Sequence, residues 1–234
     1  MRKIIKTGSI IELYEYEKTI IGKGGHQELK NLEQKERNYQ NQNIRRRNNV
    51  RRLVCANFTN ENCKFLTLTF VENETDIKKC NLEFKNFIKR LKYQFKLNDL
   101  KYITVIEFQK RGAVHYHVML NIPYIPHKKL EKLWKNGFVF VNKIKNVDNL
   151  GAYLVKYMTK DTADKRLQGQ KAYFCSRNLN KPLEMTDIKY SDLFESHWKM
   201  IENKIKKCTP VYESTYDTEC FGSCHYTQYN LNRI

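Results

Sequence analysis

Glu107, His115 and His117 are the first residues of this chain whose types and spacing suggest chemistry. They lie in EFQKRGAVHYHVML, residues 107–120, which reads as two strands joined by a short loop. If KRG forms a three-residue loop with its glycine in the left-handed conformation, Glu107 pairs with His115. Side chains alternate along a strand, so all three side chains then share one face. This set suits Mn²⁺, or Mg²⁺ with water and phosphate, and leaves open positions for catalysis; the alternative is a chance pair of histidines.

A second stretch, GAYLVKYMTKD, places two tyrosines and two lysines at helical spacing. Tyr153, Lys156, Tyr157 and Lys160 lie at i, i+3, i+4 and i+7, within a stripe of about 100°. A phenol is a poor nucleophile at neutral pH, and a nearby cation or metal favours its phenolate. The pattern therefore predicts a pair of phenol nucleophiles beside cations. The alternative is a surface helix with amphipathic tyrosines and solvated lysines.

The charge balance indicates a polyanionic partner. The 234 residues include 43 Lys and Arg against 25 Asp and Glu, a formal charge of +18. Nucleic acid is the first partner to consider and an anionic membrane the second. The segment IRRRNNVRRL reads as part of a basic helix that contacts DNA phosphates, or else as a solvated face that only adds charge. Its arginines are Arg45, Arg46, Arg47, Arg51 and Arg52.

Several classes of protein are disfavoured by what the sequence contains. No run of 18 or more apolar residues is present, so we expect no membrane span, and the N-terminus lacks the pattern of a signal peptide. Seven scattered cysteines do not resemble a disulfide framework, which favours a cytoplasmic protein. The phosphate-loop pattern G-x-x-x-x-G-K-[ST] is absent, so any replication role would need a separate helicase.

The elements that must position these residues follow from periodicity. Strands are expected at 10–16, 63–70, 101–108, 113–122 and 137–142, and helices at 26–53, 76–95, 127–135, 148–160 and 191–207. The tail after Pro210 is rich in Tyr, Thr and Ser without periodicity, which favours little regular structure. Antiparallel strands mixed with helices predict an α+β fold, an antiparallel β-sheet flanked by helices.

Three motifs in this order resemble the HUH endonucleases: FLTLTF, a carboxylate upstream of HYH, and YLVKYMTK. The resemblance is strongest to the rolling-circle replication initiators of single-stranded DNA phages and small bacterial plasmids, in their two-tyrosine form. YFCSRNLNKP, residues 173–182, is similar to a stretch that follows the tyrosine helix in such initiators. The resemblance implies a ferredoxin-like or RRM-like sheet and an endonuclease domain at 45–190. Residues 1–44 would form an N-terminal extension, and residues 191–234 a C-terminal helix and polar tail.

The resemblance also implies an activity. His115, His117 and Glu107 would hold a divalent metal, Mg²⁺ or Mn²⁺, at the scissile phosphate of single-stranded origin DNA. Tyr157, which we favour as the first nucleophile, or Tyr153 would form a 5′-phosphotyrosine, and the second tyrosine would serve the rejoining step. Lys156 and Lys160 would steady phosphate charge. A helicase and a DNA polymerase of the bacterial host are the expected protein partners, and the host cytoplasm the expected location.

Three alternatives remain at this point. A plasmid-mobilisation relaxase would use the same chemistry but usually carries a third histidine in the metal cluster. A single-strand transposase of this kind is often shorter and has one tyrosine. A non-catalytic DNA-binding protein needs neither constellation and leaves both unexplained.

Overall fold

Ten strands and five α-helices are present in the computed structural model, which describes residues 1–19, 32–142, 144, 147–159, 165–167, 169–189, 191–218 and 220–233. They belong to two compact units: Lys35–Asn180, and Met1–Gln34 together with Lys181–Ile234. Each unit contains a five-stranded antiparallel sheet with helices, which confirms the predicted α+β class. The sequence predicts boundaries near 44 and 190. The structure divides the chain at 34 and 180 and joins both chain ends in one unit.

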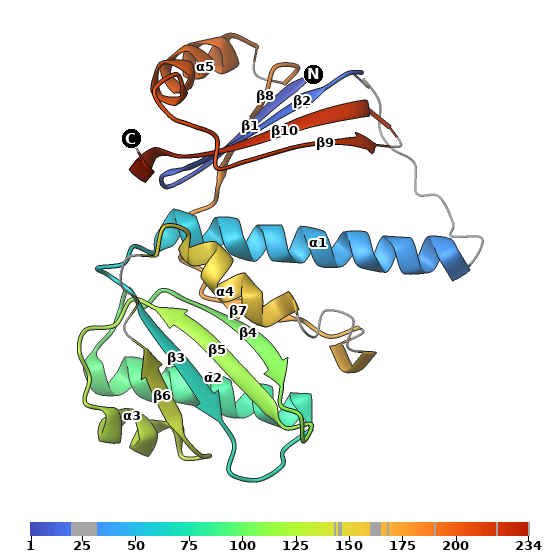
Figure 1. The fold of residues 1–234 in the computed structure, drawn as a ribbon. Helices are drawn as coiled ribbons and strands as arrows, with labels where there is room; N and C mark the ends of the chain where they lie inside the picture. Colours follow the sequence, from blue (N-terminus) through green and yellow to red (C-terminus); the bar gives the residue numbers. More distant parts are fainter. Residues whose placement is uncertain are drawn as a thin grey trace. The chain divides into compact units, whose positions relative to one another are not determined.

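The sheet of the Lys35–Asn180 unit carries the motif residues. Its strand order is β6-β3-β5-β4-β7, and every neighbouring pair is antiparallel (Figure 1). The strands are β3 (Lys64–Thr69), β4 (Tyr102–Phe108), β5 (Val114–Leu120), β6 (Val139–Asn142) and β7 (Tyr173–Cys175). Because side chains alternate along each strand, the odd-numbered residues of β3, β4 and β5 share one face.

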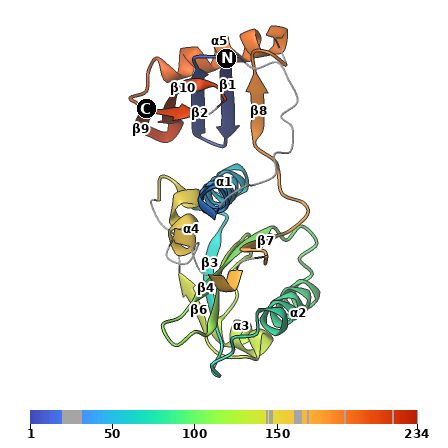
Figure 2. The same cartoon turned by 90° about the vertical axis from the view of Figure 1, so that its right-hand side faces the viewer.

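The face opposite the histidines packs against α2 (Ile77–Phe95) and α3 (His127–Trp134) (Figure 2). The carboxylate of Asp76 caps α2 by accepting the backbone N–H groups of Lys78 and Lys79, as a helix start requires. The Phe84 ring of α2 stacks on the buried Tyr116 ring of β5, with centroids 4.9 Å apart. This packing fixes which face of β5 is left for its histidines.

The histidine face packs against α4 (Leu150–Thr159), and α4 lies against α1 (Leu32–Asn57). Gly151 makes the close approach of these two helices possible. A Cβ built on Gly151 would lie 2.2 Å from the Arg51 carbonyl oxygen of α1. The side chains of Leu154, Val155 and Met158 are buried in the core. The register of α4 against the sheet is therefore set by tight packing on more than one side.

The second unit builds its sheet from strands that lie far apart in the sequence. The strand order is β8-β1-β2-β10-β9, all antiparallel. The strands are β1 (Arg2–Thr7), β2 (Ile10–Tyr16), β8 (Leu183–Thr186), β9 (Tyr212–Thr218) and β10 (Gly222–Asn230). Helix α5 (Ser191–Ile205) packs Phe194 and Ile201 against Ile4 and Ile11 of this sheet.

The expectation of little regular structure after Pro210 is wrong, because β9 and β10 occupy most of that segment. Short 3₁₀ turns are present at Lys165–Leu167 and Leu231–Arg233. Across the described part of the chain, each helix is too short or too polar to cross a bilayer.

Candidate functional site

The hairpin of β4 and β5 has the register that the sequence predicts. Glu107 pairs with His115 and Val105 pairs with His117. The loop closes through Gly112, whose φ of 93° lies in the left-handed region, and its N–H donates to the Gln109 carbonyl at 2.8 Å. The loop residue with positive φ thus sets the pairing that brings one carboxylate and two imidazoles to the same face.

These three side chains form a cluster that could hold a metal ion. One ligand atom from each of Glu107, His115 and His117 lies within 4.8 Å of the others. The His117 Nε2 contacts a Glu107 carboxylate oxygen directly. The His115 Nε2 is buried and has no hydrogen-bond partner among the described residues. A buried imidazole nitrogen without a partner is costly, and a metal in the cluster would satisfy it.

The electrostatics favour neutral imidazole, the form that binds metals. Burial, and then the neighbouring His117, lower the pKa of His115 to about 4. His115 is therefore neutral near pH 7, and one of its ring nitrogens keeps a free lone pair. His117 is only 4 % exposed. With two nitrogens and one oxygen, the donor set fits a first-row divalent ion with positions left for water or phosphate.

Thr67 of β3 orients one of the imidazoles. Its Oγ1 lies 3.1 Å from the His117 Nδ1, across the β3–β5 pairing of these two residues. If His117 binds a metal through Nε2, Nδ1 carries the ring proton and donates it to the Thr67 hydroxyl oxygen. The sequence places Thr67 only on one face of its strand, because the partner histidine lies 50 residues away.

Helix α4 brings Tyr157 onto the metal-ligand cluster. The Tyr157 ring stacks on the His117 ring, with centroids 3.9 Å apart and planes at 23°. Phe65 of β3 supports both tyrosines: its centroid is 5.3 Å from that of Tyr157 and 5.2 Å from that of Tyr153. The two tyrosine centroids are 6.1 Å apart. The predicted tyrosine stripe is thus placed beside the predicted metal ligands.

Lys156 lies against both phenol rings. Its Nζ is 3.8 Å from the ring centre of Tyr153 and 5.0 Å from that of Tyr157. Burial, and then the neighbouring Tyr153 hydroxyl, raise the pKa of Tyr157 well above its ordinary value. Tyr157 is therefore protonated at neutral pH and must lose its proton to act as a nucleophile. Lys160, the fourth residue of the stripe, lies outside the described residues.

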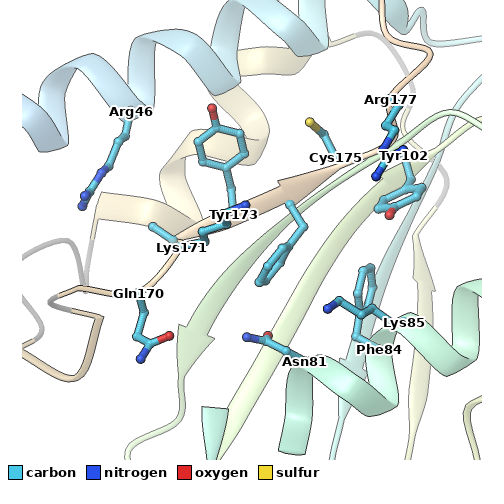
Figure 3. A pocket seen from close by; sticks show the side chains of 12 residues that line it. Arg46, Asn81, Phe84, Lys85, Tyr102, Gln170, Lys171, Tyr173, Cys175 and Arg177 are labelled. Carbon is cyan, nitrogen blue, oxygen red and sulfur yellow. The ribbon is translucent and has the colours of Figure 1, made fainter. Parts of the chain in front are cut away.

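The basic segment is helical, within α1, but its arginines do not form one group. Arg47 and Arg51 line a pocket of about 430 Å³ together with Lys156 of the tyrosine helix. Arg46 lines a different pocket, next to β7 (Figure 3). The remaining two of the predicted set are Arg45, which is exposed, and Arg52, which is half-buried; neither lines these two pockets.

A pocket of about 850 Å³ opens beside the metal-ligand cluster. Glu107 and His115 line it together with Arg111 and Arg166. The Arg166 guanidinium lies 3.8 Å from the centre of the Phe108 ring. These cations are suited to phosphate oxygens next to a bound metal. Arg111 could have been found from its place in the loop between the predicted ligands, whereas no pattern in the sequence singles out Arg166.

An α+β fold with a candidate divalent-metal centre against a helix of paired tyrosines defines the class of this protein. Residues 63–162 match a family model of replication-associated proteins of the ORF2 type. The match runs from β3 to just past α4, so it includes the metal-ligand cluster and both tyrosines. It indicates a role in DNA replication, with DNA as the partner. No curated protein and no solved structure matches this chain.

Proposed function

We propose that this protein is a rolling-circle replication initiator of the HUH type, which nicks and rejoins single-stranded origin DNA. The observation that carries the proposal is the stacking of Tyr157 on His117, with ring centroids 3.9 Å apart. A surface helix or a purely structural histidine would have no need of this contact. It places a phenol next to two imidazoles and a carboxylate that can share one cation.

In the proposed cleavage step, the Tyr157 phenol oxygen attacks the phosphorus of the scissile phosphodiester. The new bond joins the tyrosine oxygen to phosphorus, and the bond between phosphorus and the 3′ oxygen breaks. The phenol proton leaves the tyrosine, and the released 3′ oxygen takes up a proton to give a free 3′-OH. The products are a 5′-phosphotyrosine on the protein and a 3′-OH end that a DNA polymerase of the host can extend.

Glu107, His115 and His117 would hold the divalent metal. When bound, Mg²⁺ or Mn²⁺ polarises a phosphoryl oxygen and stabilises the charge that develops there. The ring proton of His117 stays on Nδ1, directed at the Thr67 hydroxyl, so that Nε2 remains available to the metal. Arg111 and Arg166 line the adjoining pocket, where they can hold the phosphates that flank the scissile bond.

Two tyrosines suit an exchange of strands at one site. Tyr153 and Tyr157 rest on the same Phe65 ring and share Lys156, so each phenol can reach the same phosphate position in turn. When the origin is regenerated, the second tyrosine cleaves it and the 3′-OH attacks the first phosphotyrosine. That reversal restores the first tyrosine and closes the DNA into a circle. Lys156 favours the phenolate form and steadies the phosphate charge.

The test is the capture of a covalent adduct. The protein is incubated with Mn²⁺ and a random-sequence pool of single-stranded oligonucleotides, and denaturant-resistant adducts are recovered and sequenced. We expect adducts enriched in one sequence, none with Tyr153→Phe plus Tyr157→Phe, and none with His117→Ala even in excess Mn²⁺. Tyr124→Phe is the matched control, because this tyrosine is 83 % exposed and lies outside the site. Full nicking by the double phenylalanine variant would overturn the proposal.

A further inference from the structure

A second pocket, of about 650 Å³, lies at the edge of the sheet next to β7 (Figure 3). None of its lining residues lines the pocket beside the metal-ligand cluster. Strand β7 pairs only with β4 among the described strands, so it forms one edge of its sheet. The pocket includes the start of YFCSRNLNKP, the motif that the proposed cleavage step leaves unused.

Aromatic rings occur on both sides of β7 in this pocket. Tyr173 pairs with Val105, so it projects to the face of the sheet that carries the histidines. Tyr102 projects to the other face, where its ring lies 5.9 Å from that of Phe84. Tyr173 and Tyr102 are both half-buried, so each ring is held on one side and reachable on the other. Rings held in this way are the platforms on which unpaired bases stack.

The charge around these rings has a single sign. Arg46, Lys85 and Arg177 line the pocket, and no described lining residue is an aspartate or glutamate (Figure 3). Asn81 adds a hydrogen-bond donor: its Oδ1 accepts the Tyr116 hydroxyl at 2.7 Å, which leaves its amide nitrogen as the group for a ligand. Cations beside stacked rings and an amide match a nucleotide, with phosphates on the cations and a base on the ring.

The position of the pocket links it to the metal-ligand cluster. His117 on β5 pairs with Val105 on β4, and Val105 pairs with Tyr173 on β7. Neighbouring strands lie about 4.8 Å apart, so the backbone of Tyr173 is roughly 10 Å from that of His117 on the same face. A DNA strand with one phosphate at the metal-ligand cluster can therefore place a nearby nucleotide at β7.

We propose that the β7 pocket binds one nucleotide of the single-stranded DNA that the protein cleaves. Its base stacks on Tyr173, and its phosphates contact Arg46 and Arg177. This inference rests on the proposed function, since it assigns the same DNA strand to both places. The pocket thereby contributes to how the strand is held in register with the scissile phosphate.

Binding is measured without cleavage, in EDTA, by fluorescence anisotropy of the full-length protein with labelled oligothymidylate of about 20 nucleotides, longer than one such domain usually covers. We expect Tyr173→Ala to raise the Kd by roughly 5- to 150-fold, the loss of one stacked base. Tyr173→Phe should bind like the wild type, because the ring remains. The matched control is Tyr124→Ala, which removes an 83 % exposed tyrosine outside the pocket and should leave the Kd unchanged.

A second variant guards against misfolding of Tyr173→Ala. Arg177 is exposed, so Arg177→Gln should fold normally and lower the slope of log Kd against log salt by about 0.7. Wild-type Kd and salt slope in both variants would overturn the assignment. Displacement of the oligonucleotide by an equal concentration of thymidine monophosphate would also overturn it, in favour of a free-nucleotide site. Failure of the cleavage chemistry is distinguishable, because it abolishes the covalent adduct and leaves the Tyr173 dependence of binding in place.

Discussion

Thr67→Val should weaken metal binding although Thr67 is not itself a ligand. Valine has nearly the shape of threonine but removes the hydroxyl that lies 3.1 Å from the His117 Nδ1. Without metal, His117 can place its proton on Nε2, against the Glu107 carboxylate, and leave Nδ1 as a bare acceptor. With metal on Nε2, the proton must be on Nδ1, and in the variant this donor has lost its partner. The substitution therefore penalises the metal-bound form more than the free form.

The burial of His117 sets the magnitude. The residue is 4 % exposed, so water replaces the lost threonine hydroxyl poorly. A buried donor without a partner costs about 1 to 3 kcal/mol. Changes to groups that orient metal ligands typically weaken metal binding about 10- to 100-fold, or about 1.4 to 2.8 kcal/mol. We expect a loss of Mn²⁺ affinity within that range.

Isothermal titration calorimetry with Mn²⁺ measures this loss, and the same strand provides the control. Thr69 lies on the same face of β3, but its hydroxyl donates to the Phe138 carbonyl at 3.3 Å. Thr69→Val removes the same atoms and should change the Mn²⁺ affinity little. Thr67→Ser should restore most of the affinity. Equal affinities for the wild type and Thr67→Val, or equal losses in the two valine variants, would refute the orienting role.

Four further predictions concern other parts of the site. Gly151→Ala should lower the free energy of unfolding by about 1 to 3 kcal/mol in urea titrations, because its Cβ would meet the Arg51 carbonyl of α1; an unchanged midpoint would contradict the packing described. Lys156→Gln should slow adduct formation by up to about 100-fold while oligonucleotide binding falls much less; equal losses in both would assign the lysine to binding alone. Arg47→Gln and Arg51→Gln should each lower the slope of log Kd against log salt by about 0.7 for single-stranded DNA, as loss of one phosphate contact predicts. Mn²⁺ at about 100 times its Kd should raise the melting temperature by roughly 5 to 11 °C in the wild type and not at all in His115→Ala; an equal rise in both would exclude His115 as a ligand.

Local signals account for what the sequence predicts well. The pairing of Glu107 with His115 follows from a short loop with a glycine, because loop length fixes the register of a hairpin. The tyrosine stripe of α4 follows from helical periodicity, and the start of α2 from the capping side chain of Asp76. Each of these features depends on residues within about ten positions of one another, so each can be read from a short stretch.

Non-local pairing accounts for what the sequence does not predict. Strand β10 pairs Cys224 with Tyr16, more than 200 residues away, and its stretch GSCHYTQYN shows no clear alternation of apolar residues. Likewise, the contact between Thr67 and His117 depends on how β3 pairs with β5. Arg166 reaches the pocket of the metal-ligand cluster from outside every recognisable motif. Such contacts depend on the assembled sheet, for which a short window of sequence carries no signal.

The most direct test of the proposed chemistry is peptide mass spectrometry of the DNA adduct formed in Mn²⁺. After digestion of the protein and the DNA, we predict a nucleotide joined through phosphate to Tyr157 or Tyr153, on the peptide derived from α4. A nucleotide attached to any other residue, or efficient nicking that leaves no attached nucleotide, would contradict a tyrosine nucleophile at this metal-ligand cluster.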